Sequence, residues 1–90
     1  MNKPLISILI STYNWSCFKL AGQLEELVTN ETEDIEIIVG EDASTDPNFL
    51  YENQKIKTLP HCKYVYFTEN NGRAKIRNKL SDIAQGKYLL

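Results

Sequence analysis

IEIIVGEDASTDP, residues 35–47, is an apolar run that ends abruptly in acidic and hydroxyl side chains. Its first five residues are nearly all apolar and mostly β-branched, which is typical of a parallel strand buried on both faces. Five polar residues follow Gly40 within six positions: Glu41, Asp42, Ser44, Thr45 and Asp46. Because ligands bind beyond the carboxyl ends of the strands in an open α/β sheet, we expect this cluster to lie at a ligand site.

Three further segments have the composition of strands. Leu5–Ile10 is apolar except for Ser7, Lys63–Phe67 combines aromatic and β-branched residues, and Lys87–Leu90 begins a fourth apolar run. We expect Leu5–Ile10 to be central and Lys63–Phe67, with its lysine and two tyrosines, to lie near a sheet edge. The predicted sheet is parallel, and its order is third, second, first, fourth strand.

Helical patterns separate these strands. Apolar residues at spacings of three and four predict helices over Cys17–Thr29 and Arg73–Ala84. Their expected inward residues are Phe18, Ala21, Leu24, Leu27 and Val28 in the first, and Ala74, Ile76, Leu80, Ile83 and Ala84 in the second.

Capping residues mark the ends of helices. Asp46-Pro47 predicts a helix start, because aspartate suits the N-cap and proline the first helical position, and this helix stops before Pro60. The polar residues 30–34 predict a turn, and Gly86 is expected to form a left-handed cap after the last helix. The order βαβαβαβ with right-handed crossovers predicts a three-layer α/β fold, in which helices cover both faces of a parallel Rossmann-like sheet.

The composition is that of one small globular domain. The chain has 90 residues, 42% apolar and 24% charged, and its net charge of −2 argues against charge-driven nucleic-acid binding. Cys17 and Cys62 lack the spacing of metal ligands and are interpreted as free thiols in a reducing compartment. His61 is the only histidine, so a Ser-His triad or a histidine metal site lacks its essential residues.

The sequence also bears on location and completeness. No apolar stretch approaches the ~20 residues of a membrane span, and the first residues lack the pattern of a signal peptide. We therefore expect a cytoplasmic protein. Because the chain ends within an apolar strand, we interpret residues 1–90 as part of a longer parent protein, truncated in the fourth strand.

The turn after the first strand distinguishes between nucleotide-binding folds. Dinucleotide-binding domains and P-loops need glycines there, but Ser11-Thr12-Tyr13-Asn14-Trp15 contains none. A phospho-receiver domain is disfavoured as well, because the first strand ends without acidic residues. An aromatic residue after the first strand and a carboxylate after the second suit a nucleobase instead. Tyr13 could stack on its face and Asp42 could accept a ring N–H.

Three segments in order resemble the N-terminal half of family-2 glycosyltransferases, which have the GT-A fold: LISILISTYN (residues 5–14), IEIIVGEDASTD (35–46) and ENNGRAKIRNKLSDIAQGKYLL (69–90). The resemblance implies a nucleotide-binding role for seven residues. Ser11 and Tyr13 would line the nucleoside pocket. Asp42 would bind the base edge, with Glu41 keeping the second charge of the acidic pair. Asn71, Gly72 and Arg77 would flank the nucleotide, and Arg77 would face the ribose or phosphate.

The same resemblance implies the activity of the parent protein. Residues 1–90 would be the donor-binding part of an enzyme that transfers a sugar, with inversion, from a nucleotide-sugar (a UDP-sugar first) to a glycan or lipid-linked acceptor. Mg²⁺ or Mn²⁺ would neutralise the leaving diphosphate, held by an Asp-x-Asp expected beyond Leu90, so no metal ligand and no catalytic residue is assigned within this chain. A peripheral membrane location of the parent stays open.

One departure from the family concerns the turn after the second strand. Ala43 stands where the family often has glycine, so we expect that turn to form without a positive φ.

Simpler interpretations stay open. Tyr13 and Trp15 would then be packing aromatics, and Arg73, Lys75 and Lys79 a solvated helix face. The alternative function is a non-catalytic nucleotide-binding or oligomerising remnant of the same fold. We also expect self-association through the open edge around Leu89 and Leu90, because unpaired strand edges template pairing with other chains.

Overall fold

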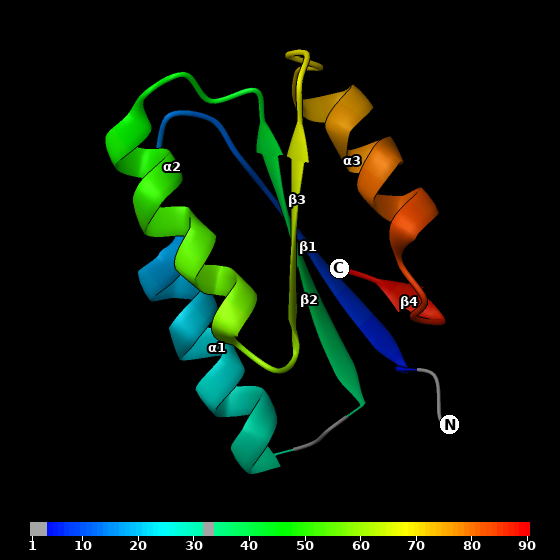
Figure 1. The fold of residues 1–90 in the computed structure, drawn as a ribbon. Helices are drawn as coiled ribbons and strands as arrows, with labels where there is room; N and C mark the ends of the chain where they lie inside the picture. The colour runs from blue at the N-terminus through cyan, green and yellow to red at the C-terminus, as the bar shows by residue number, and fades with distance from the viewer. Residues whose placement is uncertain (1–3, 32–33) are drawn as a thin grey trace.

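The computed structural model describes residues 4–31 and 34–90, and strands alternate with helices along them (Figure 1). The elements are β1 (Ile6–Thr12), α1 (Phe18–Glu31), β2 (Ile35–Asp42), α2 (Pro47–Asn53), the 3-10 helix η1 (Gln54–Thr58), β3 (Cys62–Phe67), α3 (Arg73–Ile83) and β4 (Tyr88–Leu89). The predicted turn over residues 30–34 includes residues 32 and 33, which lie outside the described residues.

The four strands form one parallel sheet of order β3-β2-β1-β4, which confirms the predicted fold class and strand order. β1 pairs with β2 along its whole length, from Ile6↔Ile35 to Thr12↔Glu41. β4 pairs with the beginning of β1, through Ile6↔Tyr88 and Ser7↔Leu89. As expected, β3 is an edge strand.

Helices cover the two faces of the sheet unequally. Figure 1 shows α1, α2 and η1 on one face and α3 alone on the other. Residues of β2 contribute to the cores on both faces of the sheet, because successive side chains of a strand point to opposite faces. Ile37 and Val39 belong to the core under α1 and η1, whereas Ile38 packs with Ile76 and Leu80 of α3.

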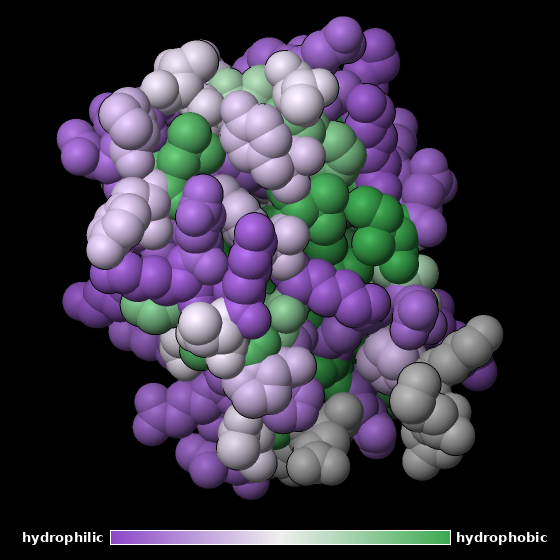
Figure 2. Space-filling model, in the orientation of Figure 1, coloured by the Kyte–Doolittle hydropathy of each residue, from purple (hydrophilic) through white to green (hydrophobic). Residues whose placement is uncertain are grey.

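An apolar surface area lies beside the edge strand β3. Figure 2 shows an apolar area between β3 and α3, surrounded by hydrophilic side chains. Val65, Phe67 and Ala84 are partly buried against the core of the α3 face.

Three predicted core positions are wrong. Leu27 is 59% exposed, and Ala74 and Ile83 are exposed as well. Ala21, Glu25 and Val28 are buried on α1, and the predicted Phe18 and Leu24 pack against the same core while partly buried. The Glu25 carboxylate accepts a hydrogen bond from the His61 backbone N–H at 2.6 Å and contacts Nδ1 of the His61 ring. A buried polar contact therefore lies on the inward side of α1, which apolar periodicity does not predict.

The cap assignments have mixed outcomes. Asp46 is the N-cap of α2, as predicted, and its side chain accepts from Asn48 N–H at 2.9 Å. The helix predicted to reach Pro60 is divided into α2 and η1. The prediction of a left-handed cap at Gly86 is wrong, because Gly72 is the one described glycine with positive φ. Gly86 is instead tightly packed: a Cβ there would lie 2.6 Å from the Ser7 backbone nitrogen.

Two remaining expectations concern the cysteines and the membrane. Cys17 and Cys62 are buried, free thiols, as predicted. Burial is the main cause that raises the pKa of Cys17 to about 11 and that of Cys62 to about 12, so both stay protonated at neutral pH. Among the described residues, no helix has both the length and the apolar character needed to cross a membrane.

Candidate functional site

A cleft of about 360 Å³ lies where β1 and β2 end. It is lined by residues from the ends of β1 and β2, from the loop before α3 and from the beginning of α3. These are Ser11, Thr12, Tyr13, Asp42, Asn70, Gly72, Arg73 and Ile76. A second hollow of about 190 Å³ shares Ser11 and Arg73 with the cleft and extends along α3 to Arg77 and Leu80. This is the carboxyl edge of the parallel sheet, where open α/β folds bind ligands.

Asp42 organises one wall of this cleft. It is 4% exposed, and its Oδ1 accepts from the Asn71 backbone N–H at 2.7 Å and from Asn71 Nδ2 at 3.1 Å. Its Oδ2 accepts from Gly72 N–H at 2.9 Å. A carboxylate oxygen has two acceptor positions, and Gly72 N–H occupies one of those on Oδ2. Among the described residues that line the cleft, Asp42 is the one carboxylate.

The loop that Asp42 holds leads into α3. Gly72 has φ 76°, and a Cβ there would meet nothing within 4 Å, so the backbone angle and not space favours glycine. Asn70 Nδ2 donates to the Asp42 carbonyl oxygen at 3.2 Å. β2 thus fixes the start of α3 through both the side chain and the backbone of Asp42.

Glu41 points to the opposite face and does not line the cleft. It is fully buried, and its carboxylate accepts from the Ser44 hydroxyl, from Asn53 Nδ2 at 3.1 Å and from the Tyr64 hydroxyl at 2.6 Å. Burial, followed by the bond to Glu41, raises the pKa of Tyr64 above its ordinary value, so the phenol stays a donor. The geometry places Glu41 in the interior that supports the β2–α2 turn.

The turn after β2 corrects one prediction. Ala43 has φ 60°, so the turn keeps the left-handed conformation although glycine is absent. Long-range bonds hold it there: Asn14 N–H donates to Ser44 Oγ at 2.8 Å, and Asn14 Oδ1 accepts from Thr45 N–H at 2.8 Å. These bonds offset the cost of a left-handed alanine, roughly 1–2 kcal/mol.

The remaining predicted residues lie at or beside the cleft. Ser11, Tyr13 and Gly72 line it, Asn71 lies behind Asp42, and Arg77 lies in the adjoining hollow. Tyr13 is 51% exposed. Trp15 is 71% exposed and is absent from the lining.

Sequence reasoning missed four residues of the lining: Thr12, Asn70, Arg73 and Ile76. Their neighbours in the chain were the available signal, because Thr12 lies between two predicted residues and Asn70 and Arg73 flank another pair. Arg73 is exposed, as expected of a solvated helix face, and it also lines the cleft that Asp42 borders.

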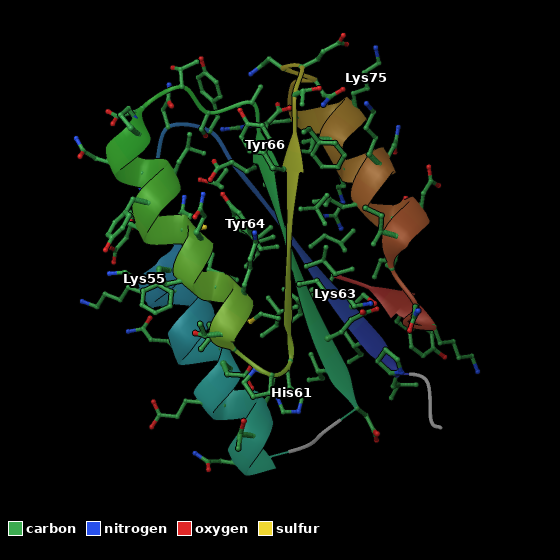
Figure 3. The ribbon with its side chains drawn as sticks, viewed as in Figure 1. Lys55, His61, Lys63, Tyr64, Tyr66 and Lys75 are labelled. Carbon is green, nitrogen blue, oxygen red and sulfur yellow. The ribbon has the colours of Figure 1, made fainter. Side chains whose placement is uncertain are left out.

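A third hollow, of about 250 Å³, lies between β3 and the α2–η1 segment, lined by Leu50, Gln54, Lys57, Tyr64 and Tyr66. Figure 3 shows Tyr64 and Tyr66 between β3 and α2. Both hydroxyls are used internally, since Tyr66 donates to the Ser44 carbonyl oxygen at 3.3 Å and Tyr64 to Glu41. This hollow lies on the face of Glu41, away from Asp42.

The described residues do not fit a metal centre. No group of three or more His, Cys, Asp and Glu side chains within residues 4–31 and 34–90 is placed to hold an ion. Asp42 is alone in the cleft and already accepts three N–H groups from the loop.

The chain is similar in sequence to known glycosyltransferases. An uncharacterized glycosyltransferase of Haemophilus influenzae is 36% identical over 99% of this chain, and the putative teichuronic acid biosynthesis glycosyltransferase TuaG of Bacillus subtilis is 33% identical over 97%. The chain spans about a third of the length of these relatives, 35% and 34%.

A structural comparison supports the fold. The mannosyltransferase PcManGT from Pyrobaculum calidifontis, solved in complex with GDP-Man and Mn²⁺, superposes with a TM-score of 0.69 over 99% of this chain and 27% of its own, at 22% identity. The TM-score shows a shared fold, of the GT-A kind. The sequence profile of Glycosyl transferase family 2 matches residues 7–90. The chain therefore belongs to glycosyl transferase family 2.

Proposed function

We propose that this chain is the donor-binding part of a glycosyltransferase and that its cleft binds the nucleotide of a nucleotide-sugar. The observation that carries the proposal is the acceptor position left on Asp42 Oδ2, in a cleft that also holds an exposed tyrosine ring and an arginine. A site that binds a nucleotide offers an aromatic ring to stack on the base, a polar group for the edge of the base and cationic side chains for the phosphates.

Each group has a distinct role in this proposal. Tyr13 stacks on the base, Asp42 accepts a ring N–H, and Ser11 contacts the nucleoside. Arg73 and Arg77, on one side of α3, face the ribose and phosphates along the adjoining hollow. Asn71 and Gly72 act through Asp42, because their N–H groups fix its carboxylate. Glu41 supports the turn beneath the site.

The donor and the setting follow from the same site and from the relatives. We propose a UDP-sugar as the first donor to test and a GDP-sugar as the second, since PcManGT was solved with GDP-Man. The name of TuaG points to a polysaccharide product, which fits transfer to a glycan or lipid-linked acceptor. Buried free thiols favour a cytoplasmic setting.

The test compares two carboxylate variants of the same region. Asp42→Asn should weaken UDP binding by roughly 1.5–3 kcal/mol, at least about tenfold, because a charge-assisted hydrogen bond is lost. Glu69→Gln is the matched control, since Glu69 lies in the loop that Asp42 binds but is exposed and absent from the lining. NMR titration with UDP and GDP measures both affinities. Equal affinity of wild type and folded Asp42→Asn would overturn the role of Asp42.

A further inference from the structure

Glu36 lies at the other end of β2 from Asp42 and on the same face of the sheet. Even-numbered residues of β2 point toward α3. Ile38 packs with Ile76 and Leu80 of α3, and a Cβ added to Gly40 would lie against Leu80. Glu36 is 7% exposed, so a carboxylate is buried about six residues along the strand from the cleft. Glu36 lines neither the cleft nor the adjoining hollow.

The Glu36 carboxylate joins three separate segments. Its Oε2 accepts from the Ser7 hydroxyl at 2.6 Å, from Gln85 N–H at 2.6 Å and from Gly86 N–H at 3.2 Å. Its Oε1 pairs with Lys63 Nζ at 3.0 Å. Figure 3 shows Lys63 on the side of β3 opposite to Tyr64, which is the side of α3. Strands β1 and β3 and the α3–β4 connection therefore meet at one side chain.

The α3–β4 connection is held closely against β1. Gly86 N–H also donates to Ser7 Oγ at 2.8 Å, and a Cβ on Gly86 would collide with the Ser7 backbone. Burial alone would raise the pKa of Glu36, but hydrogen bonds from Ser7, Gln85 and Lys63 outweigh it and hold the pKa below its ordinary value. The carboxylate is therefore ionised at neutral pH, when its acceptor strength is greatest.

Helix α3 is consequently anchored at both ends by carboxylates of one strand. Asp42 binds the N–H groups that precede the helix, and Glu36 binds those that follow it. Between the two, Ile76 and Leu80 pack on β2 at Gly40, where a Cβ would lie 2.8 Å from Leu80 Cδ2. The helix that carries Arg73 and Arg77 has little freedom to slide or tilt.

We propose that Glu36 is a positioning residue for the cationic side of the cleft: by pinning the end of α3, it holds Arg73 and Arg77 where the phosphates of the donor bind. This inference rests on the proposed function, since it assigns the phosphates to α3. Glu36 touches no ligand. Its removal acts on the phosphate contacts more than on the base contacts, because Asp42 is the last residue of β2 and Tyr13 directly follows β1.

The experiment uses the full chain and two probes, UDP and uridine. In Glu36→Gln we expect the affinity for UDP to fall about threefold to tenfold, while that for uridine changes less than about twofold. Amide exchange at Gln85 and Gly86 should accelerate, because their acceptor is weakened. General destabilisation would lower the two affinities together, so their ratio separates positioning from folding.

Two further variants complete the test. Lys63→Met removes the ion pair but keeps the acceptor of Gln85 and Gly86, and its UDP-to-uridine ratio should match wild type. If Glu36→Gln does not fold, Ser7→Ala removes the hydroxyl shared by Glu36 and Gly86 and should shift the ratio in the same direction. An unchanged ratio in the folded variant overturns the inference. Failure of wild type to bind either probe overturns the proposed function instead.

Discussion

The adjacent β2 residues Glu41 and Asp42 lie on opposite faces of the sheet, in different environments. Glu41 points to the face covered by α1, α2 and η1, where it is fully buried and accepts from three side chains. Asp42 points to the face covered by α3 and borders a cleft. The pleat of the strand, and not proximity in sequence, decides which acidic residue is available to a ligand.

The coverage of the two faces explains why a cleft forms beside Asp42. Helices α1 and α2 and η1 cover the Glu41 side. There the buried Asn53 donates hydrogen bonds to Glu41 and to the Trp15 carbonyl oxygen and accepts one from the Cys17 N–H. On the other side, the single helix α3 begins only after a loop that bends around Asp42. Side chains enclose Glu41 on one face, where the hollow lies beside Tyr64 and Tyr66, whereas on the other face the cleft borders Asp42 itself.

The largest expected effect concerns the closed face. Glu41→Ala leaves the Ser44, Asn53 and Tyr64 donors without their buried acceptor, so the free energy of unfolding should fall by about 3 kcal/mol or more. Urea denaturation followed by circular dichroism measures the change. Glu52→Ala, which removes an exposed carboxylate paired with Lys55, should change stability by less than about 0.5 kcal/mol. Similar effects of the two variants would contradict the buried role of Glu41.

Alanine substitutions at Gly86 and Gly22 compare how tightly the backbone is packed on the two faces of the sheet. Gly86→Ala places a methyl group against Ser7 on the α3 side and should cost about 1–3 kcal/mol of stability. Gly22→Ala, in α1, meets nothing within 4 Å and should stabilise the helix by about 0.5–1 kcal/mol. Thermal unfolding of both variants checks the opposite signs. A neutral Gly86→Ala would show that the α3–β4 connection is loose.

A smaller effect concerns pH and one carboxylate on each face. Burial raises the pKa of Glu25 and of Glu36, but hydrogen bonds, led by His61 for Glu25 and Ser7 for Glu36, bring both below the ordinary 4.5. Because the folded pKa lies below the unfolded one, both carboxylates stabilise the fold above pH 4.5, and this contribution is lost as pH falls through the folded pKa.

Replacing either carboxylate should flatten this pH dependence. Glu25→Gln and Glu36→Gln should each have a shallower fall in unfolding free energy below pH 4.5 than wild type. Urea titrations at a series of pH values measure the slopes. Slopes equal to that of wild type would mean that these carboxylates have the same pKa in both states.

The sequence predicts the fold well because its signals are local. The strand compositions and the Asp46-Pro47 start need no distant contact to be interpreted, and the strand order is confirmed. The division between Glu41 and Asp42 was not predicted, because a parallel strand buried on both faces lacks the alternation that would reveal its orientation.

Long-range contacts account for the other differences. Ala43 takes a positive φ because Asn14, about 30 residues away, binds the turn that follows it. Glu25 is buried on the inward side of α1, where it binds His61, 36 residues further on. Neither contact has a local signal, so sequence periodicity alone could not supply it.

A chemical-shift titration of the ¹⁵N-labelled chain with UDP tests the central claim most directly. The account predicts the largest shifts at the backbone amides of residues 11–13 and 70–73, which line or border the cleft beside Asp42. The amides around Gln54 and Tyr64, in the hollow on the Glu41 face, should change little. Shifts concentrated in that hollow, with residues 11–13 and 70–73 unperturbed, would contradict the account.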